Sequence, residues 1–169
     1  MERLQADGAL VQLSERFTNS AAFGSLFREG MDLVEETAAY LDGAGRVEAK
    51  ALDRAVSLTY ATESMRLTTR LMQLASWLLL HRAVKEGEMT LSQANREKTK
   101  VKLTAADPGP ADTIEKLPAQ LQDLIHRSMS LQTRVRRLDS TIHTPPAEHA
   151  AIGNPLVPHL NALKAAFER

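Results

Sequence analysis

The residues of this chain that could do acid–base or metal chemistry are its histidines. They are His81, His126, His143, His149 and His159. None belongs to the His-Glu-x-x-His pattern of a helical zinc site. The last three fall in or beside a stretch rich in Pro and Ala, which would give a metal no rigid support. The first two lie at the edges of apolar helical patterns, where boundary residues are common. We therefore predict no metal site and no catalytic histidine.

Carboxylates that are close in the sequence do not make a catalytic pair here. Glu35 and Glu36 are neighbours on a predicted helix, and adjacent helical side chains point about 100° apart. Glu86 and Glu88 flank a glycine at a predicted helix end and should be solvated. The sequence also contains no glycine-rich phosphate loop, no Gly-x-Ser-x-Gly motif and no dinucleotide fingerprint. We predict a protein that is not an enzyme and has no catalytic residue and no cofactor.

Two basic clusters could contact nucleic acid. They are Arg96, Lys98, Lys100 and Lys102, and Arg134, Arg136 and Arg137. Neither cluster has interleaved aromatic residues, and Glu97 and Asp139 dilute them. The 21 Lys and Arg balance the 21 Asp and Glu, so no overall field attracts nucleic acid or an anionic membrane. Solvated helix surfaces are the leading interpretation. The alternative is a helical nucleic-acid-associated regulator that uses the clusters 96–102 and 134–137.

One helical face carries the residue types that are most typical of a protein interface. Its members are Glu63, Arg66, Arg70, Gln73, Trp77 and Leu80, spaced by three or four residues. Arg and Trp are enriched at interface hot spots, and this is the only Trp in the chain. The face predicts a contact with a partner or with a second copy. The alternative is that Trp77 meets another helix of the fold and that the arginines pair with Glu63.

The elements that position these residues are predicted to be helices. Strand patterns are nearly absent, and only 4% of residues are aromatic. With 43% hydrophobic residues, a chain of 169 residues can form one domain with a real core. We predict an all-α three-helix bundle over residues 19–143 that forms a homodimer. Its helices are expected at about 20–42, 46–86 and 118–143, with a linker at 88–117 in which Thr90 can cap a short helix.

The predicted helix 46–86 dominates this architecture. It contains no Pro or Gly, and at 1.5 Å per residue it would span about 60 Å. Its apolar residues form two seams, roughly 120° apart, that predict burial against two neighbours. One seam is Leu58, Met65, Met72 and Leu79 with Ala61 and Ala75, and the other is Tyr60, Leu67, Leu71, Leu74 and Leu78. Gly43 is predicted to adopt the left-handed conformation and to reverse the chain, so that the first two helices run antiparallel.

The ends of the chain are predicted to be flexible. Residues 1–18 form an N-terminal arm without the apolar run of a secretory signal, and residues 144–169 form a tail. Within the tail, 156–167 is a short amphipathic segment that could dock into a groove through Leu156, Leu160, Leu163 and Phe167. The longest apolar run, 71–80, is half the length of a membrane span. Together with the absence of Cys, this predicts a cytoplasmic protein.

Several ungapped strings resemble the alphaproteobacterial RcdA family. They are Ser25–Met31, Tyr40–Gly43, Glu63–Leu79 and Glu86–Thr90, within a match over roughly 20–100. The resemblance implies a three-helix bundle that forms a homodimer and serves as an adaptor in regulated proteolysis. In that family, RcdA is recruited to the ClpXP protease through the response-regulator-like adaptor CpdR. It then tethers substrates or a further adaptor and promotes turnover of cell-cycle regulators such as CtrA. The resemblance assigns no single residue to a partner contact.

Overall fold

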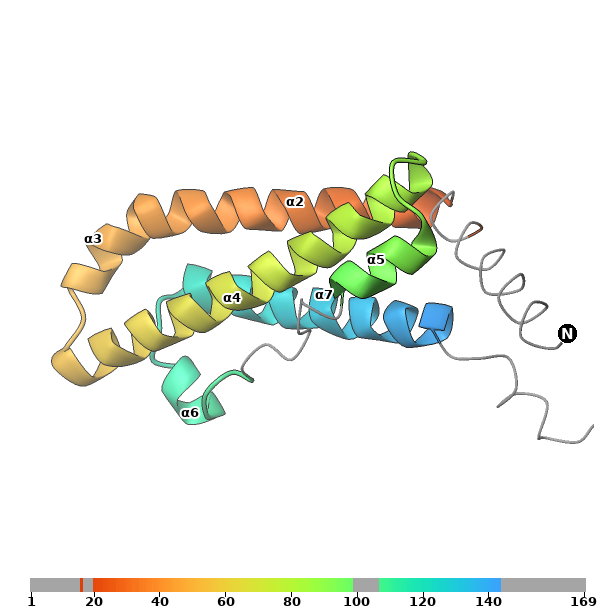
Figure 1. Ribbon diagram of the computed structural model, residues 1–169. Helices are drawn as coiled ribbons and strands as arrows, with labels where there is room; N and C mark the ends of the chain where they lie inside the picture. The colour runs from red at the N-terminus through yellow and green to blue at the C-terminus, as the bar shows by residue number, and fades with distance from the viewer. Residues whose placement is uncertain (1–15, 17–19, 99–106, 144–169) are drawn as a thin grey trace, which may run out of the picture.

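The computed structural model describes residues 16, 20–98 and 107–143, and all regular structure in these ranges is helical. The helices are α2 (Ala21–Asp42), α3 (Ala44–Lys50), α4 (Arg54–Lys85), α5 (Leu91–Lys98), α6 (Ala111–Ile114) and α7 (Ala119–His143). Three long helices, α2, α4 and α7, pack against one another, and the short helices lie at their ends and edges (Figure 1). The predicted all-α class is confirmed for this part of the chain. The predicted arm and tail lie outside the described residues, apart from Arg16.

The first long helix begins where the sequence predicts a cap. The Ser20 hydroxyl accepts a hydrogen bond from the Phe23 N–H at 3.3 Å, which satisfies one of the unpaired donors at the start of α2. Gly30, farther along, is buried against α4, where a Cβ would overlap a methyl group of Leu78. The missing side chain therefore lets α2 and α4 approach closely.

The predicted single helix at 46–86 is wrong, because the chain forms two helices there. α3 ends at Lys50 and α4 begins at Arg54, and the Asp53 carboxylate accepts from the Val56 N–H at 2.9 Å. An Asp that caps the following helix favours a break without any Gly or Pro. The chain reverses at this break, whereas Gly43 has a φ of −112° and not the predicted left-handed conformation. α2 and α4 still run antiparallel, as Figure 1 shows.

The corner between α2 and α4 is closed by two tyrosines. The Tyr40 hydroxyl donates to the Glu48 carboxylate at 2.7 Å, which ties α2 to α3. Gly45 is buried, and a Cβ there would lie 2.5 Å from the Tyr60 hydroxyl. Burial is the main cause of a raised pKa at both Tyr40 and Tyr60, because it disfavours the charged phenolate.

The last long helix matches its prediction closely. α7 begins directly after Pro118, whose fixed φ suits a helix start. The predicted apolar row is buried, with Leu138 partly exposed: Leu121, Leu124, Ser128, Leu131, Val135 and Ile142. Thr90 caps α5, as predicted, and exchanges hydrogen bonds with Gln93. No helix within the described ranges has the length and apolarity needed to cross a membrane.

Candidate protein-interaction surface

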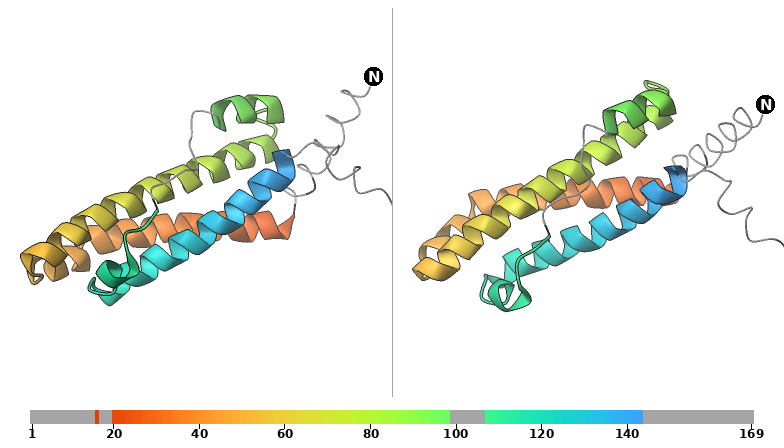
Figure 2. Two further views of the ribbon diagram at one scale, coloured as in Figure 1. Left: turned by 90° about the horizontal axis from the view of Figure 1, so that it is seen from below. Right: turned by 60° about the horizontal axis from the view of Figure 1, so that its bottom comes forward.

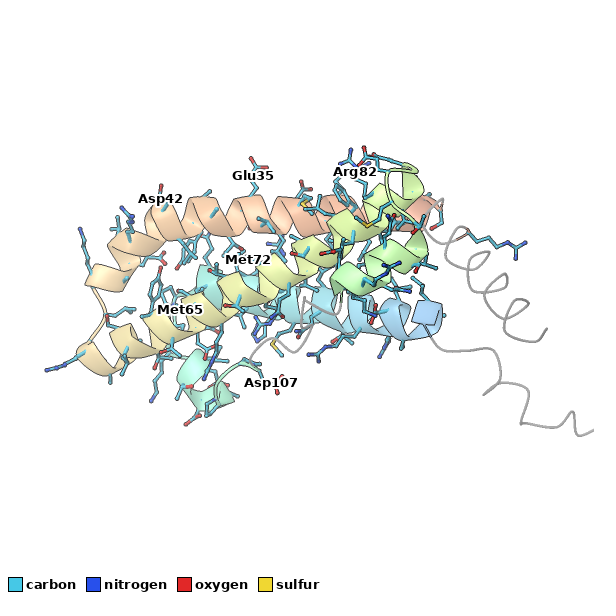
Figure 3. The ribbon with its side chains drawn as sticks, viewed as in Figure 1. Glu35, Asp42, Met65, Met72, Arg82 and Asp107 are labelled. Atoms are coloured by element: carbon cyan, nitrogen blue, oxygen red, sulfur yellow. The ribbon has the colours of Figure 1, made fainter. Side chains whose placement is uncertain are left out.

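The outer side of α4 carries a row of large apolar side chains, which we name the α4 stripe. It consists of Leu58, Met65, Met72 and Leu79, with exposed fractions of 71%, 72%, 67% and 51%. The four residues recur every seven positions over about 32 Å of helix. α2 and α7 lie on the same side of α4 (Figure 2, left), and Met65 and Met72 lie along the opposite side (Figure 3). The prediction that this seam belongs to the core is therefore wrong.

The side of α4 that carries the stripe also lacks charge. Between Ala55 and Leu80 the only charged residues are Glu63, Arg66 and Arg70. Glu63 and Arg70 are buried, and Arg66 is half-buried. Exposed helix faces are normally rich in Lys, Glu, Arg and Asp, and helices that are apolar all round are normally covered on all sides. α2 and α7 cover one side of α4, and on the other side α5 packs near its C-terminal end only.

Three small polar residues beside the stripe make their hydrogen bonds within α4. The hydroxyl groups of Thr62, Thr68 and Ser76 each donate to the carbonyl oxygen four residues earlier, at 2.8 to 3.0 Å. A hydroxyl that is bonded in this way has its donor satisfied and needs no partner across an interface. The stripe therefore lies in a surface that can be covered at little cost in lost hydrogen bonds.

The face that the sequence predicts as an interface lies inside the fold. Trp77 is 1% exposed, and its Nε1 donates to the Asp139 carboxylate of α7 at 2.9 Å. Arg70 is also 1% exposed, and it donates to the Ser128 hydroxyl of α7 at 2.8 Å. Burial lowers the pKa of Arg70, and nearby carboxylates oppose that shift. The alternative interpretation, in which Trp77 meets another helix of the fold, is confirmed.

Glu63 joins the start of the α6 region to α4. Its Oε1 accepts from Arg66 at 2.5 Å and from the Gly109 N–H at 3.0 Å, while the residue itself is 2% exposed. The pairing of an arginine with Glu63 is thus confirmed as well. Gln73 and Leu80 are half-buried at the edge of this face. The prediction that the six residues form an outward surface is wrong for the buried members Glu63, Arg70 and Trp77.

One signal in the sequence could have placed this face correctly. Ser128 occupies a core position in the otherwise apolar row of α7, and Asp139 follows Leu138 in the same helix. A polar residue in a buried row needs a polar partner, and a buried arginine or indole N–H is a suitable one. α4 therefore turns its polar side chains toward α7, which leaves Leu58, Met65, Met72 and Leu79 on the outside.

The histidines are not gathered into a site. His81 is buried with its ring 4.1 Å from that of Trp77, and His126 is exposed on α7. Within 20–98 and 107–143, no three His, Asp or Glu side chains converge in a way that could hold a metal ion. His149 and His159 lie beyond the described residues, as does the amphipathic segment with Leu156, Leu160, Leu163 and Phe167.

Several cations of the basic clusters are held in ion pairs. Lys98 of α5 lies 2.6 Å from the Asp139 carboxylate, and Arg134 of α7 pairs with Glu29 of α2. Lys100 and Lys102 fall outside the described ranges. The part of the two clusters that the structure describes is therefore partly neutralised by carboxylates of the same chain.

Comparison with known proteins places the chain in a family. A family described as "Protein of unknown function (DUF1465)" matches residues 14–167. No curated protein matches the chain. The crystal structure of RcdA from Caulobacter crescentus CB15 is 51% identical, with a TM-score of 0.63, and the match covers 76% of this chain and 96% of that chain. Identity at this level over almost the whole of that structure confirms the resemblance seen in the sequence strings, and the chain belongs to the RcdA family.

Proposed function

We propose that this protein is a non-enzymatic adaptor in regulated proteolysis, which binds other proteins and promotes degradation of selected substrates. Membership in the RcdA family supports this role. The α4 stripe is the observation that supports assembly with another chain, because a long exposed row of apolar side chains on an uncharged face suits the docking of a protein helix, that of a second copy included. Two of its four members are Met, whose flexible side chains adapt to different partners.

The partners, substrates and location that we propose are those of the RcdA family. We propose that the partners are the ClpXP protease with a CpdR-like adaptor, together with protein substrates or further adaptors. Cell-cycle regulators are the proposed class of substrate, and the cytoplasm is the proposed location. The absence of Cys from the chain is in keeping with a reducing compartment.

A second copy of the chain is the proposed occupant of the α4 stripe. The four residues are placed symmetrically about positions 68 and 69. Two antiparallel α4 helices would therefore set Leu58 of one copy against Leu79 of the other, and Met65 against Met72. A two-fold interface requires this kind of self-complementarity. The proposed homodimer is thus a pair of three-helix bundles joined along α4.

The dimer can be tested with the double substitution Met65→Glu and Met72→Glu. Both side chains are more than 60% exposed in the single chain, so the fold should tolerate the change. In the proposed dimer the new carboxylates face one another, and four buried Met side chains are lost. At roughly 1.5 kcal/mol or more for each side chain, the dissociation constant should rise by at least about ten-thousandfold, as measured by sedimentation equilibrium.

A matched control adds the same charges elsewhere. Ser130→Glu with Thr133→Glu places two carboxylates on exposed positions of α7 and should leave the dissociation constant unchanged. Equal weakening by both double substitutions would point to a general effect of charge. A parent protein that stays monomeric at high concentration would contradict the proposed dimer.

The adaptor role itself needs a reconstituted reaction. Purified ClpXP, a CpdR-like adaptor and a candidate substrate are combined with ATP, with and without this protein. We expect substrate loss to accelerate only when the protein and the CpdR-like adaptor are both present. Unchanged degradation, together with recovery of no partner from a native lysate, would refute the role.

The nucleic-acid alternative receives little support from the described residues. Lys98 and Arg134 are engaged with Asp139 and Glu29, so fewer cations remain to displace counterions from a phosphate backbone. Binding to generic duplex DNA with a steep salt dependence would favour the nucleic-acid alternative over the adaptor role.

A further inference from the structure

A second apolar surface lies where α2 begins and α7 ends. These two helix ends meet at the same end of the molecule (Figures 1 and 2). A cavity of about 450 Å³ opens between them, lined by Ala22, Ser25, Leu26 and Glu29 of α2 and by Arg134, Arg137 and Leu138 of α7. We name this cavity the α2–α7 pocket. Its volume falls in the range of about 300–1,000 Å³ that is common for ligand-binding sites.

The lining of the pocket suits an amphipathic peptide. The surface inside the pocket is mainly apolar, with Leu26 and Leu138 among its members. Charged groups of both signs complete it, because Glu29 pairs with Arg134 across the two helices and Arg137 is exposed beside them. A helix with one apolar face and mixed charge at its edges would match this distribution.

The chain itself supplies such a peptide close to the pocket. α7 ends at His143, five residues after Leu138, which is about 8 Å along the helix. Residues 144–155 then lead to the C-terminal segment, 156–167, and twelve residues can span up to about 40 Å when extended. The segment can therefore reach the pocket easily. A tether of this length also gives it an effective concentration on the order of millimolar.

The sequence of the C-terminal segment fits the same site. In a helix that begins at Pro158, Leu160, Leu163 and Phe167 would share one face, with Leu156 directly before the first turn, and Lys164 and Glu168 would flank that face. An isolated helix needs roughly 12 to 15 residues to be even marginal in water, so this segment requires a groove to become helical. The α2–α7 pocket offers one next to the point where α7 ends.

We propose that the C-terminal segment docks as a helix in the α2–α7 pocket of its own chain, with its row of Leu and Phe side chains entering the cavity. A segment held there is not available to another protein. A partner that binds the segment must first displace it from the pocket, and the pocket thereby weakens every such interaction by the cost of undocking.

The absence of Cys permits a direct test by cross-linking in the full chain. Ser25→Cys places a thiol at an exposed residue of the pocket, and Ala166→Cys places one at the edge of the apolar face of the segment. A disulfide needs Cα atoms within about 7 Å, so it reports close approach. We expect oxidation to give mainly a closed monomer, whose yield does not change on dilution. Pairing Ala38→Cys, on an exposed part of α2 outside the pocket, with Ala166→Cys should yield about tenfold less.

A charge in the pocket should release the segment. Ala22 is exposed and lines the pocket, so Ala22→Glu disturbs docking without disturbing the core. We expect it to lower the yield of the Ser25–Ala166 cross-link about tenfold, because the new carboxylate loses its water when the segment covers it. Ala38→Glu, which adds the same charge to α2 away from the pocket, should leave the yield unchanged.

Three results would overturn the proposal. Equal yields from the Ser25 and Ala38 pairs would show that the segment has no preferred site. Cross-linked dimers that disappear on dilution would assign the pocket to the segment of a second copy. A high yield between Ser14→Cys and Ser25→Cys, with a low yield for Ala166→Cys, would assign it to the N-terminal residues instead. All three are measured on the isolated protein, so they do not depend on the proposed adaptor role.

Discussion

Individual side chains decide which side of α4 points inward. Arg70 and Trp77 each need a hydrogen-bond partner when buried, and α7 provides the Ser128 hydroxyl and the Asp139 carboxylate. Leaving either donor buried without a partner would cost about 1–3 kcal/mol. Leaving Met65 or Met72 in water loses a similar amount of hydrophobic free energy. An exposed Met can still gain it when another molecule covers the side chain. The polar pairs therefore determine the rotation of α4 in the fold.

The tyrosines at the corner of the fold predict a loss of stability in alkali. The pKa of Tyr40 is raised from 10.0, by burial first and then by its hydrogen bond to Glu48, and the pKa of Tyr60 is raised too. The folded state therefore holds these protons more tightly than the unfolded state does. The free energy of unfolding should be insensitive to these groups below about pH 10 and should fall above it, as the unfolded tyrosines ionise.

Tyr40→Phe tests the predicted alkaline loss of stability, because it removes one of the two ionisable hydroxyl groups. It should cost about 1 kcal/mol near neutral pH, through the lost hydrogen bond to Glu48, and should make the decline above about pH 10 shallower. Urea unfolding at a series of pH values measures both effects. An identical alkaline decline in the parent and the variant would show that Tyr40 does not contribute to it.

At the scale of elements, the sequence predicted some boundaries well and others badly. α7 was predictable because Pro118 marks its start and its apolar row follows a single heptad pattern. The break before α4 was missed because Asp53 caps a helix in the middle of a stretch that has no Gly or Pro. The candidate site was missed for a different reason. α4 is apolar on several sides, so periodicity could not reveal which side stays exposed.

Removal of the Asp53 cap should destabilise the start of α4. Asp53→Ala leaves the Val56 N–H without its side-chain acceptor and should cost about 1 kcal/mol. In a domain of this size that corresponds to roughly 2–4 °C in Tm, measured by circular dichroism. Asp53→Asn keeps an acceptor oxygen and should restore most of the loss. If Asp53→Ala had no effect on Tm, the turn at 51–53 would have to be fixed by other contacts.

At the scale of the whole molecule, one core joins all three long helices, and the α4 stripe lies outside this core. Buried residues run from Phe23 of α2 through Leu78 of α4 to Ile142 of α7 in one cluster. The α4 stripe is separated from this cluster by the body of α4 itself. The protein is therefore built with its core complete and with apolar surface left over, which is the arrangement expected of a subunit or an adaptor.

Association through the stripe should make Tm depend on protein concentration. A dimer that dissociates on unfolding gains about 1.4 kcal/mol of stability for each tenfold rise in concentration. For the parent protein we expect Tm to rise by roughly 1–3 °C per tenfold, because the unfolding entropy is that of two chains, and calorimetry measures this rise. The Met65→Glu and Met72→Glu double variant should show no such rise. A Tm that is independent of concentration in the parent would argue against a dimer linked to folding.

The hydroxyl groups beside the stripe have one more consequence. Because Thr62, Thr68 and Ser76 bond to the backbone of α4 itself, these three hydroxyl groups do not fix the position of a helix laid along the stripe. Coiled coils use a single buried polar residue to fix alignment, and these three hydroxyl groups do not serve as one. A bound helix could slide by one heptad, about 10.5 Å, and still find Leu or Met beneath it. The alignment of a partner must then be fixed at the ends of α4, where the sequence again contains charged residues. The middle of the stripe would contribute affinity, and the ends would contribute specificity.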